Sequence, residues 1–208
     1  MAKNKIAKEI LEWALTIIIP VVAALLIHQY LFTFARVDGT SMLDTLHENN
    51  IMGVSRLHYR LNEPQRGEII TCNYPEDGNK LFVKRIIGLP GETIEIREGT
   101  VYIDGEPIAE TYLTRVDDQS MDPITLAKDE IFVMGDNRPV SRDSRAVGPL
   151  TLDEIYGRVL FVAFPFNEIR STMALPKYRA QGEKKDVSLR YDAARRRAGA
   201  VRDLFFAG

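Results

Sequence analysis

The sequence predicts a mainly β fold, an antiparallel β-sheet domain that follows an N-terminal transmembrane helix. Two observations predict it: an uncharged apolar run near the N-terminus, and short β-branched and aromatic segments separated by turn residues after residue 36. With 208 residues, 45% of them hydrophobic, the chain can fold one modest domain around its own core. We expect four parts: an N-terminus at 1–12, a membrane helix at 13–35, a β-rich domain at 36–170, and a flexible basic tail at 171–208.

The apolar run covers residues 13–34 and contains no acidic or basic side chain except His28. As a helix it would be roughly 33 Å long, enough to cross a hydrocarbon core of about 30 Å. Three lysines precede the run and one arginine follows it closely, which places the N-terminus in the cytoplasm and the β-rich domain outside. A cleavable secretory signal is disfavoured because bulky residues 30–34 stand where cleavage would occur. A buried core helix, which Pro20 would suit, is disfavoured by the length of the run.

The β-rich domain is predicted from segments with high strand propensity. They are 69–71, 81–87, 93–96, 101–103, 131–134 and 159–164. Glycine-containing turn sequences separate several of them, and Thr93–Ile103 has the pattern of a hairpin. Residues Leu152–Tyr156 form at most a short helix.

Composition excludes several classes of function. The net charge of −2 and the pI of about 6.0 disfavour nucleic acid as a partner. The single cysteine, Cys72, cannot form an intramolecular disulfide, and the three histidines lack the paired spacing of a zinc site. We therefore expect no disulfide framework and no structural metal.

Ser41 lies a few residues beyond the predicted membrane helix, in the segment Val37–Leu46. By itself it is a weak candidate nucleophile, because a serine beside Gly39 is usually a turn residue. No second glycine completes a nucleophile elbow, and His47 is too close in sequence to indicate a catalytic triad. If Ser41 attacks a substrate, its base must come from another segment.

Lys84 lies within the predicted strand 81–87. Because side chains alternate across a strand, Lys84 shares one face with Phe82 and Ile86. A lysine that protects a sheet edge is the simpler interpretation. The functional interpretation is burial, which can lower a lysine pKa from about 10.4 by about 3 to 5 units and so create a general base.

The loop 135–145 follows a predicted apolar strand and contains glycine, asparagine, proline and alternating charges. A solvated turn is one possibility, and an ordered network of side chains is the other. In the network, Arg145 would pair with Asp143 or Asp136, and the Ser141 hydroxyl would orient the amine of Lys84.

Three blocks in this order resemble the bacterial type I signal peptidase family. They are Ser41–Leu46, Lys84–Glu92 and Gly135–Arg145, and the resemblance extends over about residues 10–170. It implies a serine endopeptidase that removes signal peptides from exported preproteins at the outer face of the bacterial cytoplasmic membrane, without a cofactor. By resemblance, Ser41 is the nucleophile and Lys84 the base, while Ser141 positions Lys84, and Asp143 and Arg145 support the loop.

The implied substrates are preproteins with small residues before the cleavage site, and membrane lipid is the other implied partner. Shallow apolar pockets would bind the small side chains. We expect the following apolar residues near the Ser/Lys pair to line them: Val37, Met42, Leu46, Phe82 and Val83.

Gly39 and Asp44 depart from the family pattern. Some members have, in place of Gly39, a serine whose hydroxyl joins the oxyanion hole, but other members also have glycine there. Asp44 stands where proline is usual, and since a carboxylate near Lys84 would raise the lysine pKa, we expect Asp44 to face solvent or to pair elsewhere. The tail 171–208 is unexpected. A surface tail is favoured over binding to anionic lipid, for which its basic residues would also be suited.

Two alternative functions share part of this sequence pattern. A non-catalytic signal-peptidase-like assembly factor for surface structures is the main alternative, but such relatives typically lack the serine or the lysine. A self-cleaving repressor would carry a DNA-binding domain in place of the membrane helix.

Overall fold

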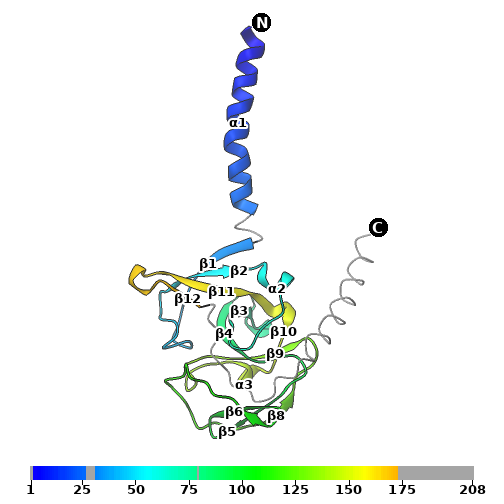
Figure 1. Cartoon of the computed structure of the whole chain (residues 1–208), viewed down its shortest axis with the longest axis vertical. Coiled ribbons are helices and arrows are strands. Elements are labelled where there is room, and N and C mark those ends of the chain that lie inside the picture. Colours follow the sequence, from blue (N-terminus) through cyan, green and yellow to red (C-terminus); the bar gives the residue numbers. More distant parts are fainter. Residues whose placement is uncertain (1, 27–30, 79, 173–208) are drawn as a thin grey trace, which may run out of the picture.

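The computed structural model describes residues 2–26, 31–78 and 80–172. Almost all of the predicted tail at 171–208 lies outside these residues. Figure 1 shows a long N-terminal helix that projects from a body made of β-strands. The mainly β prediction is therefore confirmed for the domain.

Helix α1 covers Ala2–Leu26 and contains Pro20. Several of its apolar side chains are exposed, among them Trp13 (71%) and Ile17 (62%). Among the residues that the structure describes, no helix combines the length and hydropathy needed to cross a membrane.

The predicted helix at 13–35 is wrong at its C-terminal end, because β1 occupies Phe32–Arg36. These residues pair in antiparallel register with β2, Ile51–Ser55, and Phe34 lies opposite Gly53. A side chain at Gly53 would collide with the rings of Phe32 and Phe161, within 2.7 Å. Aromatic rings packed over a glycine thus hold β1 in the sheet.

The larger sheet has eight antiparallel strands in the order β1-β2-β11-β3-β4-β9-β10, with β12 paired to β11. Its remaining strands are β3 (Ile69–Asn73), β4 (Leu81–Gly88), β9 (Glu130–Met134), β10 (Leu150–Thr151), β11 (Ile155–Phe164) and β12 (Arg170–Ser171). Short helices join them: α2 (His58–Leu61), α3 (Ser144–Val147), η2 (Pro75–Asp77), η3 (Leu152–Glu154) and η4 (Phe166–Glu168). The short helix expected within Leu152–Tyr156 is η3, and β11 begins directly after it.

The smaller sheet has the order β7-β6-β5-β8 and lies at the far end of the body from α1 (Figure 1). Its strands are β5 (Thr93–Arg97), β6 (Thr100–Ile103), β7 (Glu106–Pro107) and β8 (Met121–Thr125). Strands β5 and β6 form the predicted hairpin, with Ile94 opposite Ile103. Strand β8, which was not among the predicted strands, contains Pro123, and the proline is tolerated because β8 is an edge strand.

Three buried apolar clusters hold the body together. One joins the smaller sheet to β9 through Phe132 and Met134. A second packs beneath the segment that follows β1 and includes Met42 and Leu46. The third lies on the other face of the larger sheet, around Ile86. Strands β4 and β9 pair with each other between these clusters. The close packing around them fixes the position of Lys84 on β4 and of the loop 135–145 that follows β9.

Candidate active site

Ser41 lies on the nucleophile loop, which we define as residues 38–46 between β1 and β2. Met42 and Leu46 are almost fully buried, at 2% and 0% exposure, and so anchor the loop in the apolar cluster below it. Gly39 has a φ of 100°, a backbone conformation that side chains disfavour. These constraints fix the loop while Ser41 itself remains partly exposed.

Lys84 reaches the nucleophile loop from the middle of β4. Its Nζ donates to Ser41 Oγ at 2.8 Å, and the residue is only 2% exposed. Burial lowers the pKa of Lys84, against an opposing effect of the Asp143 carboxylate, which favours the charged amine. The arrangement therefore favours a neutral amine within reach of a hydroxyl, as a serine nucleophile and its base require.

Arg85, the next residue, points to the opposite face of β4. Its Nε and Nη2 donate to the two oxygens of Asp136 at 2.8 and 2.6 Å, and both side chains are buried. Thr45, near the end of the nucleophile loop, also donates to Asp136. This ion pair thus fastens the loop from the face of β4 that lies opposite Lys84.

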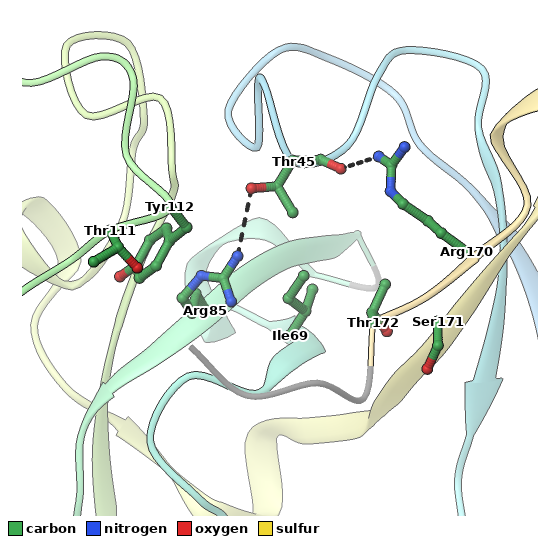
Figure 2. Close-up of a pocket in the computed structure, with 8 residues that line it drawn as sticks. All are labelled: Thr45, Ile69, Arg85, Thr111, Tyr112, Arg170, Ser171 and Thr172. Carbon is green, nitrogen blue, oxygen red and sulfur yellow. Dashed lines mark hydrogen bonds between the residues drawn. The ribbon is translucent and has the colours of Figure 1, made fainter. Parts of the chain in front are cut away.

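A cavity of about 280 Å³ lies on the Arg85 face (Figure 2). Its described lining residues are Thr45, Ile69, Arg85, Thr111, Tyr112, Arg170, Ser171 and Thr172. Because Lys84 and Arg85 point to opposite faces of β4, this cavity lies on the face opposite to the Lys84 side chain.

The loop 135–145 is an ordered network, as one of the two sequence interpretations predicted. Asn137 donates from its backbone N to the carbonyl of Ser41 and from Nδ2 to the carbonyl of Thr40, both at 3.0 Å. Sequence reasoning missed this role of Asn137. The Gly-Asp-Asn sequence directly after a buried strand was the available signal.

Asp143 and Arg145 hold the rest of this loop. Asp143 is fully buried, accepts from Gly135 N at 3.0 Å, and pairs with Arg145 Nε at 2.9 Å. Burial opposes the charge of Arg145, but its hydrogen bond with Asp143 contributes to a raised pKa of the guanidinium. Of the two predicted partners of Arg145, the structure selects Asp143, since Asp136 pairs with Arg85.

Ser141 Oγ is buried and has no hydrogen-bond partner among the described residues. The structure therefore does not show the expected contact with Lys84. A side chain at Gly135 would lie 2.2 Å from this hydroxyl and 2.5 Å from the Ser41 carbonyl. Glycine at 135 thus allows the loop to approach the nucleophile closely.

The predicted pocket residues lie in two places. Val37, Met42 and Leu46 belong to one buried cluster, and Val83 packs against it. Phe82 packs against the cluster on the other face of the sheet. In this conformation the first three are core residues, and their role as a pocket lining stays a prediction.

Comparison with known proteins identifies the family. The family model described as "Signal peptidase, peptidase S26" matches residues 10–164. Signal peptidase I of Bacillus amyloliquefaciens is 41% identical, with 82% of this chain and 97% of the relative covered. Signal peptidase I T of Bacillus subtilis is 40% identical, with 78% and 89% covered. A crystal structure of a signal peptidase I from Enterococcus faecalis is 34% identical, with a TM-score of 0.42, and covers 47% of this chain and 97% of that one. The chain belongs to the signal peptidase family, peptidase S26.

Proposed function

We propose that the protein is a membrane-anchored serine endopeptidase that cleaves signal peptides from exported preproteins. In this proposal Ser41 is the nucleophile and Lys84 the general base. One observation carries it: a buried lysine amine lies 2.8 Å from the hydroxyl of Ser41. Relatives named signal peptidase I, about 40% identical over most of the chain, support the substrate class.

The reaction is acyl transfer. Neutral Lys84 takes the proton of Ser41 as Oγ attacks the scissile carbonyl carbon, and the backbone N–H of Ser41 helps to stabilise the oxyanion. When the peptide C–N bond breaks, Lys84 returns the proton to the leaving amine. A water molecule then attacks the acyl-enzyme, Lys84 accepts its proton, and Ser41 is regenerated.

The neighbouring side chains have supporting roles in this proposal. Asp143 and Arg145 hold the loop 135–145 against the nucleophile loop through the contacts described above. Ser141 would position Lys84 after a rotation of its hydroxyl side chain, since no other described group holds that oxygen. Small substrate side chains would enter beside Val37, Met42, Leu46, Phe82 and Val83.

The membrane anchor is proposed from the part of the apolar run that precedes β1, residues 13–31, with the N-terminus in the cytoplasm and the β-rich domain outside the bacterial cytoplasmic membrane. The exposed apolar side chains of α1 support it. Exposed aromatic residues on β1, at the end of β11 and in η4 would suit contact with lipid: Phe34 (57%), Phe164 (43%) and Phe166 (78%).

Cleavage of a preprotein with an Ala-x-Ala site by the detergent-solubilised full chain tests the proposal. Wild type should release the mature protein, whereas Ser41→Ala and Lys84→Ala should not, with unchanged circular dichroism. If wild type cleaves none of several such preproteins, the enzymatic role is refuted and a non-catalytic assembly role gains.

A further inference from the structure

A segment that connects two strands of the smaller sheet contacts three elements that support the proposed active site. We call residues 109–119, between β7 and β8, the strap. The strap contains no helix or strand. Although its sequence contains no signal for catalysis, it touches the nucleophile loop, β4 and the loop 135–145.

The strongest contact of the strap is a buried ion pair. Glu110 accepts from both terminal nitrogens of Arg138, one of them at 2.8 Å, and the two side chains are 6% and 2% exposed. Tyr112 in the strap donates to the same carboxylate at 2.5 Å. Burial opposes the charge of Arg138, yet the hydrogen bonds and the charge of Glu110 raise its pKa, so the guanidinium stays charged.

Arg138 links Glu110 to the turn that contacts the backbone of Ser41. Its Nε donates to the carbonyl of Gly135 at 3.1 Å, and its backbone N donates to the carbonyl of Asp136. The turn 135–138 is thereby closed on itself. Asn137, within this turn, binds the backbone carbonyl of Ser41 at 3.0 Å. Only the Arg138 side chain and the backbone of this turn therefore separate Glu110 from the backbone of Ser41.

Further contacts fasten the rest of the strap. The ring of Tyr112 lies 4.0 Å from the Arg85 guanidinium, and Figure 2 shows the two side chains together beside the cavity. Asp117 pairs with Arg145 at 2.7 Å, and both side chains are largely buried. Thr114 donates to Asp44 at the rim of the nucleophile loop.

We propose that the strap is a positioning element for the Ser41–Lys84 pair, and that Glu110 is its principal positioning residue, acting through Arg138. The inference rests on the proposed function. Glu110 is buried behind the turn and would not touch substrate, so its loss should affect turnover and leave substrate binding unchanged.

The first test compares kcat and KM of Glu110→Ala, Glu110→Gln and wild type on the Ala-x-Ala preprotein, with the full chain in detergent. We expect kcat to fall about 100-fold in Glu110→Ala and about 10-fold in Glu110→Gln, since small displacements of reacting groups have effects of this size. The KM should stay within about twofold. The matched control is Glu106→Gln on β7, an exposed carboxylate outside the strap, which should behave as wild type.

Thermal unfolding separates positioning from stability. All kcat values are measured below the unfolding midpoint of each variant and expressed per folded molecule. If Glu110 only stabilises the fold, the midpoint falls while kcat per folded molecule stays at the wild-type value, and the proposal is overturned. Glu110→Gln, which keeps the shape of the side chain, decides the question if Glu110→Ala does not fold.

A double-variant cycle tests the route through Arg138. Glu110→Ala combined with Arg138→Ala should lose no more kcat than Arg138→Ala alone, because the two residues act as one unit. Losses that simply multiply would overturn the route. If wild type itself cleaves nothing, the proposed function fails; if wild type and all Glu110 variants cleave equally, only the role of the strap fails.

Discussion

The two faces of β4 bury two adjacent basic side chains with opposite consequences. Lys84 is 2% exposed and contacts the uncharged hydroxyl of Ser41, so burial lowers its pKa. Arg85 is 4% exposed and makes a two-point ion pair with Asp136. A buried cation with a bidentate carboxylate keeps its charge, whereas a buried amine without one is driven toward the neutral form.

The nucleophile loop makes contacts with side chains from both faces of β4. Ser41 contacts Lys84 on one side, and Thr45 donates to Asp136 on the other. One face of β4 thus carries the proposed base, Lys84, and the other carries Arg85, whose ion pair holds the loop in place. This division follows from the alternation of side chains along a strand.

Replacement of Lys84 should have the largest effect on activity. We expect Lys84→Met to reduce kcat by about four orders of magnitude or more, as loss of a base from a nucleophile–base unit does elsewhere. Thermal stability should be unchanged or higher, because a buried ionisable group is replaced by an apolar one. Lys84→Arg should be equally inactive at every pH, since a guanidinium cannot be deprotonated. Activity retained in Lys84→Arg would refute the role of a neutral amine.

Replacement of Arg85 should act mainly on stability. Arg85→Met leaves Asp136 buried without its guanidinium partner, and we expect a loss of about 3 to 5 kcal/mol in the free energy of unfolding. Chemical denaturation measures it. The matched control is Arg97→Met on β5, whose ion pair with Glu95 is exposed and whose loss should change stability little. Equal effects of the two substitutions would contradict the importance of burial.

The pH dependence follows from the lowered pKa of Lys84. Because the neutral amine is the base, kcat/KM should rise with pH, with its midpoint below the ordinary lysine value of about 10.4. The unfolded state binds more protons than the folded state between these two pKa values, so stability should also rise with pH in that window. Lys84→Met should lose this rise in stability. A kinetic midpoint at or above about 10.4 would contradict the proposed base.

Sequence reasoning reached the local features of the fold and site. The β-branched segments became β3–β6, β9 and β11, because strand propensity and turn residues act over short distances. The resemblance placed Ser41 and Lys84 together, and the structure joins them at 2.8 Å. The strap could not be predicted, since Glu110 and Arg138 are separated by 28 positions and Glu110 lies in no patterned segment. Only the packing of one sheet against the other brings them together.

Asp44 should have the smallest effect, because its partners hold it at the rim of the site. It accepts from Thr114 and Arg115, so the expectation that it pairs away from Lys84 is confirmed. The hydrogen bond from Thr114 lowers the pKa of Asp44, which stays ionised at neutral pH. We expect Asp44→Asn to change kcat/KM by no more than about twofold, since exposed pairs contribute little. The midpoint of the pH profile should not move. A shift of that midpoint to lower pH, with higher activity near neutrality, would show that the Asp44 carboxylate acts on Lys84 after all.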